Sequence, residues 1–175
     1  PELHDFGFKI TIKHLLSQSS GLHDFMALKE IAGWREKDVF TQKDALDLIL
    51  QQKKLDYEPG TKFSQTTSGF ILLAEVVKKV TNQTLAEFSQ AHIFQPLKMS
   101  NTLFCDDNEM IIPNAAISYQ TTKNGFKHNL INYSIVGTTN LYTSAADMTR
   151  WYLNFENPKV GSKKISNRLK NMNWV

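Results

Sequence analysis

One segment near the middle of the chain restricts the fold more than any other. Residues 68–80 read Ser-Gly-Phe-Ile-Leu-Leu-Ala-Glu-Val-Val-Lys-Lys-Val, and in an α-helix their apolar side chains cover most of the circumference. A helix of this kind must be packed on several sides, so other elements have to surround it. We therefore expect 68–80 to be the central helix of the core, with Gly69 allowing a close backbone approach near its start.

Three further helices are predicted from the way they begin. Thr41, Thr84 and Ser144 each stand three residues before an acidic residue, which is the pattern of a capping box. Apolar residues then recur at helical spacing. Two shorter helices are also expected, and Gly21 would follow the first of them as its stop. The five predicted helices cover about 42–53, 84–95, 144–155, 12–18 and 26–35.

Residues 100–143 have a different character from the rest of the chain. They contain Pro113, Gly125, Gly137, scattered Asn and Thr, and only short β-prone pieces. Long irregular segments in a compact domain are usually functional or pack along a partner surface. We therefore predict a mainly α chain with a few short strands. The predicted core residues are Leu15, Leu16, Leu46, Ile49, Phe70, Leu73, Val77, Phe88, Trp151 and Phe155.

The charges and the apolar pattern exclude several classes of function. Twenty Lys+Arg against 17 Asp+Glu leave a formal charge of +3 spread along the chain, so we predict no nucleic-acid binding. The longest strongly apolar stretch, Phe70 to Ala74, is far shorter than the ~20 residues that cross a bilayer, so we predict no membrane insertion. The five histidines and the single Cys105 show no ligand spacing, so neither a metal nor a cofactor is predicted.

Four ordered segments carry a family pattern. Residues 10–22 read Ile-Thr-Ile-Lys-His-Leu-Leu-Ser-Gln-Ser-Ser-Gly-Leu, and residues 57–73 begin with Tyr-Glu-Pro-Gly-Thr-Lys-Phe-Ser. Residues 94–102 contain Pro-Leu-Lys-Met, and residues 136–148 end with Thr-Ser-Ala-Ala-Asp-Met. They resemble the I-T-[IV]-[RK]-H-L-L, P-G-x-x-[FW]-x-Y-[SG]-N, P-L-G-M and S-[TS]-A-x-D-[ML] patterns of serine β-lactamase and penicillin-binding-protein-like hydrolases. That group includes class C β-lactamases, D,D-peptidases and esterases.

The resemblance implies a catalytic site that this chain does not complete. Such enzymes acylate on the Ser of an S-x-x-K motif, the Lys and the Tyr of a Y-x-N motif move protons, and a K-T-G or H-x-G strand lines the site. No Ser here has Lys three residues later, and neither strand motif occurs. Gln65 and Thr67 stand where the family has Tyr and Asn, and a carboxamide has no useful proton to give or take. We predict no catalytic residue; Ser64, Gln65 and Thr67 are candidates for lining a ligand cleft.

The order of the family motifs also predicts which part of the protein this is. In the family, S-x-x-K lies upstream of the first segment and the K-T-G-type strand lies downstream of the last. We therefore expect residues 1–175 to form a single partial domain, the helical lobe of the α+β β-lactamase/transpeptidase-like fold, with 100–143 as an irregular segment within it. The chain starts with Pro-Glu-Leu and no initiator Met, which suggests that it is cut from a longer precursor.

Three hypotheses for the function stay open at this point. The chain is a fragment of a serine hydrolase whose parent transfers acyl groups from a β-lactam, a D-Ala-D-Ala peptide or an ester, and is inactive as given. Alternatively, it is a non-catalytic relative that binds peptidoglycan peptides or a protein partner, or a stable remnant with no activity. Loss of the packed strands should expose an apolar face and favour self-association. The resemblance implies a periplasmic or extracellular location, which the sequence alone does not determine.

Overall fold

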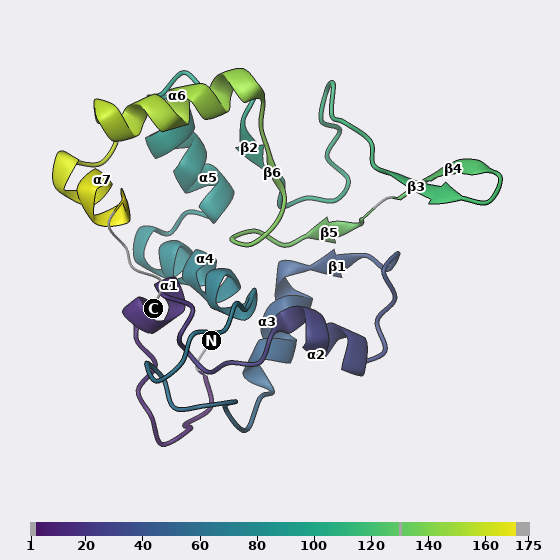
Figure 1. Cartoon of the computed structure of the whole chain (residues 1–175), viewed down its shortest axis with the longest axis vertical. Coiled ribbons are helices and arrows are strands. Elements are labelled where there is room, and N and C mark those ends of the chain that lie inside the picture. The colour runs from purple at the N-terminus through teal and green to yellow at the C-terminus, as the bar shows by residue number, and fades with distance from the viewer. Residues whose placement is uncertain (1–2, 130, 171–175) are drawn as a thin grey trace.

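Helices make up most of the regular structure (Figure 1). The structure is a computed structural model that describes residues 3–129 and 131–170. The helices are α1 (Ile12–Leu16), α2 (Phe25–Ile31), α3 (Gln42–Leu50), α4 (Ser68–Thr81), α5 (Leu85–Ser89), the π-helix η1 (Gln90–Phe94), α6 (Ala145–Glu156) and α7 (Lys163–Lys170). Within these residues, no helix combines the length and the apolar character needed to cross a membrane.

Local capping explains why the helix starts were predictable. The Thr41 hydroxyl accepts a hydrogen bond from the Asp44 amide at 3.3 Å, and the Thr41 amide donates back to the Asp44 carboxylate at 2.9 Å. Thr84 and Glu87 form the same reciprocal pair. The helix ends differ more from the prediction: the helix expected over 84–95 is α-helical only to Ser89 and then continues as η1. The terminal helix α7 was not predicted.

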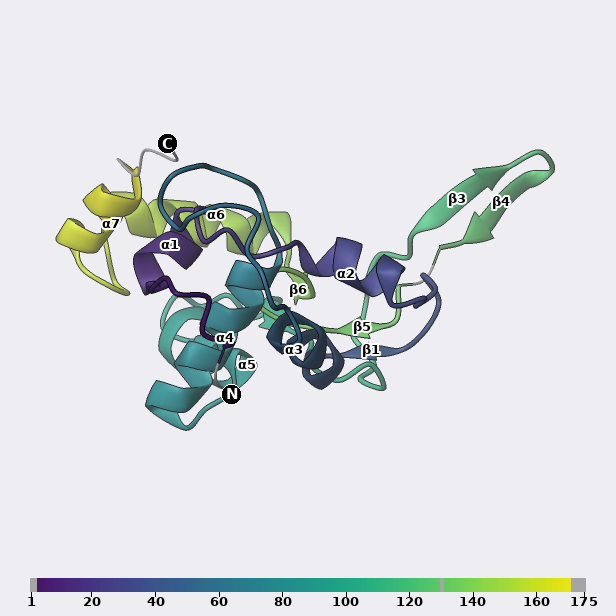
Figure 2. The same cartoon turned by 90° about the horizontal axis from the view of Figure 1, so that it is seen from below.

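The strands are short and form three separate pairs in the described part of the chain. β1 (Phe40–Thr41) lies parallel to β5 (Tyr133–Ser134), and β2 (Leu103–Phe104) lies antiparallel to β6 (Leu141–Tyr142). β3 (Tyr119–Thr122) and β4 (Gly125–His128) form a hairpin. Figure 2 shows this hairpin projecting away from the helices. The segment 100–143, expected to be irregular, thus contains all of these strands except β1.

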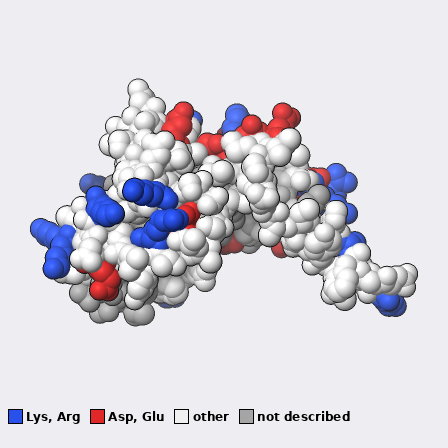
Figure 3. All heavy atoms as spheres, turned by 90° about the horizontal axis from the view of Figure 1, so that it is seen from above, with Lys and Arg blue, Asp and Glu red and all other residues white. Residues whose placement is uncertain are grey.

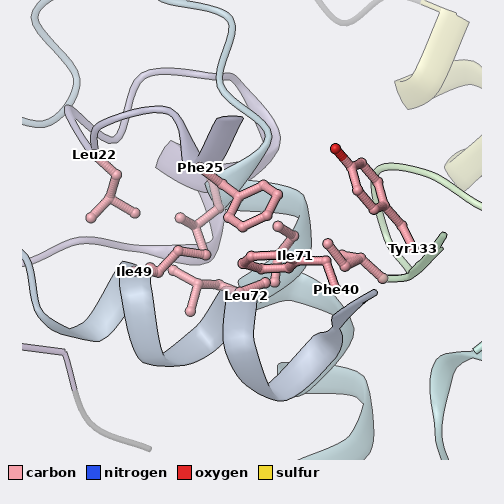
Figure 4. Close-up of a cluster of buried hydrophobic side chains, with 10 residues drawn as sticks. Leu22, Phe25, Phe40, Ile49, Ile71, Leu72 and Tyr133 are labelled. Atoms are coloured by element: carbon pink, nitrogen blue, oxygen red, sulfur yellow. The ribbon is translucent and has the colours of Figure 1, made fainter. Parts of the chain in front are cut away.

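A first apolar cluster surrounds α4. Its buried members are Leu15, Leu22, Phe25, Phe40, Ala45, Ile49, Ile71, Leu72, Tyr133 and Ile135 (Figure 4). The cluster joins α1 to α4 with the β1–β5 pair, which agrees with the central position predicted for residues 68–80. Gly69 contributes as expected, since a Cβ there would lie 3.4 Å from the Leu15 carbonyl oxygen. α1 and α4 can therefore approach closely at this point.

A second apolar cluster lies between η1 and α6. Phe94, Leu97 and Met99 are buried there, and the partly buried Trp151 packs against them. The prediction that Leu16 belongs to the core is wrong, because this side chain is 39% exposed. α1 ends at Leu16 and turns the neighbouring Leu15 toward α4 instead. The other predicted core residues that belong to neither buried set are partly exposed: Leu46, Phe70, Leu73, Val77, Phe88 and Phe155.

Candidate functional site

The candidate cleft residues lie on the second of two loops that run side by side. One loop, 17–24, joins α1 to α2, and the other, 51–67, joins α3 to α4. Hydrogen bonds connect the loops at Asp56 N to Gly21 O (2.8 Å), Gly60 N to Ser19 O (2.8 Å), Ser64 N to Gln18 O (2.9 Å) and Thr66 N to Gln18 Oε1 (2.9 Å). Hydrogen bonds therefore join the first two motif segments directly.

Gly21 lies at a close backbone contact between these two loops. Its backbone has a φ of +75°, and a Cβ on it would lie 2.1 Å from the Tyr57 carbonyl oxygen. The expectation that Gly21 stops the first helix is wrong, because α1 already ends at Leu16 and is capped by Ser17. Gly21 instead allows the two loops to touch.

Thr67 is held by a carboxylate from the first loop. Its backbone amide and its hydroxyl both donate to Asp24 Oδ1, at 2.7 Å and 2.6 Å. The other Asp24 oxygen accepts from the Met26 amide and so caps α2. One carboxylate thus aligns the starts of α2 and α4. The Thr67 hydroxyl proton is committed to this bond, so toward a ligand the oxygen can only accept.

Ser64 and Gln65 have a different environment from Thr67, because both are exposed. The Gln65 carboxamide can donate and accept hydrogen bonds but cannot act as a proton acceptor near neutral pH. The apolar side chain of Phe63, beside them, is half exposed. The segment therefore presents a mixed polar and apolar surface.

Tyr57 is a phenol next to this segment that the sequence analysis did not single out. Burial raises the pKa of its hydroxyl, while the Gly21 backbone and the Ser64 hydroxyl oppose that rise. The Tyr57 oxygen is buried without a well-oriented hydrogen-bond partner among the described residues. The tyrosine of the Y-x-N pattern corresponds to Gln65 in this chain, so Tyr57 is a different residue of the same segment. In the sequence, Tyr57 is marked only by its place at the start of the second motif segment, residues 57–73.

An activated serine is not found in the described part of the chain. No serine hydroxyl there is hydrogen-bonded to a lysine ammonium: Ser68 Oγ donates to the His23 carbonyl at 2.7 Å, and the Ser17 and Ser19 hydroxyls share a bond of 2.8 Å. Across residues 3–129 and 131–170, no cluster of three or more His, Cys, Asp or Glu side chains could hold a metal ion. The groups that are present can bind and orient a ligand.

A hollow of about 300 Å³ lies between the N-terminal segment, α1 and α4, away from the candidate residues. Apolar side chains such as Ile12, Val76 and Val80 line it, whereas Ser64, Gln65 and Thr67 do not. This hollow and the candidate residues are therefore separate features of the surface.

A buried carboxylate joins the third and fourth motif segments. Asp147 has no exposed surface, and its Oδ2 accepts from the Asn101 amide at 2.7 Å and the Thr102 hydroxyl at 2.9 Å. Its Oδ1 accepts from Arg150. The Ser144 hydroxyl accepts from the Asp147 amide, but the carboxylate does not return to Ser144 as the predicted capping box requires. The Asp147 carboxylate binds Asn101, Thr102 and Arg150 instead of closing a capping box.

The four motif segments therefore occupy two structural joints, one between the paired loops and one at Asp147. The model of the Beta-lactamase family matches residues 1–173. This chain belongs to the beta-lactamase family. The match covers both joints, so the motifs quoted from the sequence are parts of the family's scaffold, and the beta-lactamase/transpeptidase-like fold follows from it.

Individual relatives agree with membership of the beta-lactamase family. A D-aminopeptidase of Gluconobacter oxydans is 27% identical over 139 residues, which are 79% of this chain and 26% of that protein. An octameric penicillin-binding protein homologue from Pyrococcus abyssi superposes with a TM-score of 0.81 at 22% identity, over 99% of this chain and 41% of that one. A penicillin-binding protein from Bacillus halodurans gives 0.77 at 26% identity, over 93% and 51%. The chain thus spans about a quarter of the curated relative and about half of each solved structure.

Proposed function

We propose that this chain is the central part of a beta-lactamase-like serine hydrolase and has no acyl-transfer activity by itself. The observation that carries the proposal is the environment of residues 64–67. Gln65 offers a carboxamide where the family pattern has a phenol, and the pKa of the adjacent Tyr57 is raised rather than lowered. In the described residues, no serine is paired with a lysine to serve as nucleophile.

The proposed parent protein transfers acyl groups from a β-lactam, a D-Ala-D-Ala peptide or an ester. The name of the D-aminopeptidase relative favours an amide of a D-amino acid among these. In this proposal residues 1–175, including the segment 100–143, form one partial domain, the helical lobe, and Ser64, Gln65 and Thr67 form one wall of the substrate cleft. The opposite wall and the nucleophile would come from the regions of the relatives that this chain does not match.

A second candidate is a non-catalytic module that binds peptidoglycan peptides. The exposed Gln65 favours it, because a carboxamide matches the donor and acceptor pattern of a peptide bond. The Thr67 hydroxyl, held by Asp24, leaves one acceptor on the same surface. Neither group requires proton transfer to bind a peptide.

Labelling with a fluorescent penicillin tests the absence of acylation. We expect no covalent adduct on this chain by denaturing electrophoresis and mass spectrometry, because no serine hydroxyl among the described residues is hydrogen-bonded to a lysine that could take its proton. A penicillin-binding protein labelled in parallel confirms that the probe reacts. A penicillin adduct on any serine of this chain would contradict the proposal.

Titration of the same chain with a peptide ending in D-Ala-D-Ala distinguishes the inactive fragment from the binding module. Saturable amide-resonance shifts around Gln65 that disappear in Gln65→Ala but persist in Gln95→Ala would favour the binding module. If neither the peptide nor penicillin causes a saturable shift, the chain is better described as an inactive fragment than as a binding module.

We also propose that the chain self-associates through the apolar hollow beside α4. Ile12 and Val80, which line it, are 55% and 79% exposed. We expect sedimentation velocity at micromolar concentration to show species heavier than the 20.0 kDa monomer. Val80→Lys should shift the distribution toward monomer, whereas Val39→Lys, which lies outside the hollow, should not. A monomer with no binding of a hydrophobic dye would refute this proposal.

A further inference from the structure

A second hollow, of about 330 Å³, lies between the turn after η1, α6 and the loop that follows α6. Figure 3, which looks down on α6, shows Lys and Arg side chains gathered close together on the left half of this face. The residues that line the hollow are Leu97, Lys98, Arg150, Leu153, Asn154, Asn157 and Lys159. It shares no lining residue with the candidate cleft segment, and three of its lining residues are cationic.

Hydrogen bonds anchor the guanidinium of Arg150 and the backbone of Lys159 beside this hollow. Arg150 donates through Nη1 to Asp147, so its guanidinium is anchored while its other N–H groups stay available. Lys159 is positioned by Asn154, a largely buried residue whose Oδ1 accepts from the Lys159 amide at 2.8 Å and the Val160 amide at 3.0 Å. The Asn154 amide group donates to the Val160 carbonyl, which closes the loop against α6.

The balance of charge in this hollow is positive. Its lining includes no carboxylate, and the Asp147 carboxylate that anchors Arg150 also accepts from Asn101 and Thr102. The ammonium groups of Lys98 and Lys159 have no ion-pair partner in the part of the chain that the structure describes. Two uncompensated cations and one anchored guanidinium therefore face one small space.

The backbone of Lys98 adopts a conformation that lysine disfavours. Its φ is +58°, in the left-handed region that glycine tolerates and lysine rarely adopts. The turn is held by Leu97 N to Ile93 O (3.1 Å), Lys98 N to Gln95 O (3.0 Å) and Met99 N to Phe94 O (2.8 Å). The P-L-G-M pattern quoted above has glycine at this place, whereas this chain has Pro-Leu-Lys-Met. A strained backbone that carries a charge into a positive hollow points to a role for that charge.

We infer that this hollow binds a phosphoryl group carried by a small molecule with an apolar part. The forked N–H groups of a guanidinium suit the oxygens of a phosphate, and lysine ammonium groups add point charges around a dianion. Leu97 and Leu153 form the apolar portion of the lining, where the organic part of the ligand lies. The site is independent of the proposed hydrolase function.

Titration with phenyl phosphate tests this inference on the full chain. Binding is measured by isothermal calorimetry in 150 mM NaCl, with inorganic phosphate and phenol as comparison ligands. We expect phenyl phosphate to bind more tightly than inorganic phosphate, and phenol not to bind. Lys98→Gly should weaken phenyl phosphate binding by about fivefold or more, the effect expected for losing one charged contact. Lys159→Gln should do the same.

The choice of glycine at position 98 separates a binding role from a structural one. Because glycine tolerates a positive φ, Lys98→Gly should unfold in urea at the same concentration as the parent chain or a higher one, even though it binds more weakly. Lys127→Gln, an exposed lysine on the β3–β4 hairpin, should leave binding unchanged. Equal phenyl phosphate affinity in the parent chain and Lys98→Gly, or equal weakening by Lys127→Gln, would overturn the inference.

Discussion

Gly21→Ala is expected to lower the free energy of unfolding by about 3 to 4 kcal/mol, as judged from urea denaturation followed by circular dichroism. Two effects add at this position. Alanine disfavours the left-handed conformation by roughly 1–2 kcal/mol. Its Cβ would also lie 2.1 Å from the Tyr57 carbonyl oxygen, a backbone atom that cannot move without separating the two loops. That separation breaks the bond from Asp56 N to Gly21 O and its neighbours.

Gly33→Ala is the matched control for this prediction. Gly33 has a φ of +83°, but nothing lies within 4 Å of a Cβ built on it. Its substitution should therefore cost only the conformational part, about 1–2 kcal/mol. If Gly21→Ala and Gly33→Ala lose equal stability, the contact between the loops contributes nothing, and the model of a paired-loop joint is wrong.

Asp147→Ala should destabilise the chain by about 3 to 5 kcal/mol, the range observed when one partner of a buried charged network is removed. The Asn101 amide and the buried Thr102 hydroxyl would lose their acceptor, and Arg150 would lose its anchor. Each buried donor left without a partner costs about 1–3 kcal/mol. The midpoint of urea denaturation, with an unchanged slope, measures this loss.

Two companion variants make the Asp147 experiment specific. Asp147→Asn keeps one acceptor oxygen and the same shape, so it should lose less stability than Asp147→Ala. Asp47→Ala removes an exposed carboxylate that pairs with Lys43 on the surface of α3, and should change stability by about 0.5 kcal/mol or less. A loss after Asp147→Ala no larger than the loss after Asp47→Ala would show that the joint between the third and fourth segments is not needed.

Local chemistry explains which parts of the fold could be predicted from the sequence. Thr41 and Thr84 cap their helices through residues three positions away, so those starts were visible in the pattern. α1 uses the same device with His14 as the third residue, which a search for acidic side chains does not detect. At Ser144 the pattern was present but the Asp147 carboxylate binds Asn101 and Thr102 instead, partners more than forty residues away in sequence.

The candidate site was predictable only in part, for a similar reason. The replacement of Tyr and Asn by Gln65 and Thr67 could be read from the motif, but the partner of Thr67, Asp24, lies 43 residues earlier. Nothing local in the sequence pairs them. The raised pKa of Tyr57 depends on burial between two loops. The left-handed backbone of Lys98 likewise comes from the turn that follows η1, and no residue preference of lysine predicts it.

The presence of two separate apolar clusters affects how the chain unfolds locally. They share no residue: the first draws its buried members from Leu15 to Leu72 plus Tyr133 and Ile135, and the second from Phe94, Leu97 and Met99 against α6. A chain built in this way has two cooperative units, each with its own opening free energy. Amide protons in α6 are then expected to exchange with solvent without waiting for α3 and α4 to unfold, so the half that carries the basic hollow can loosen while the paired loops stay closed.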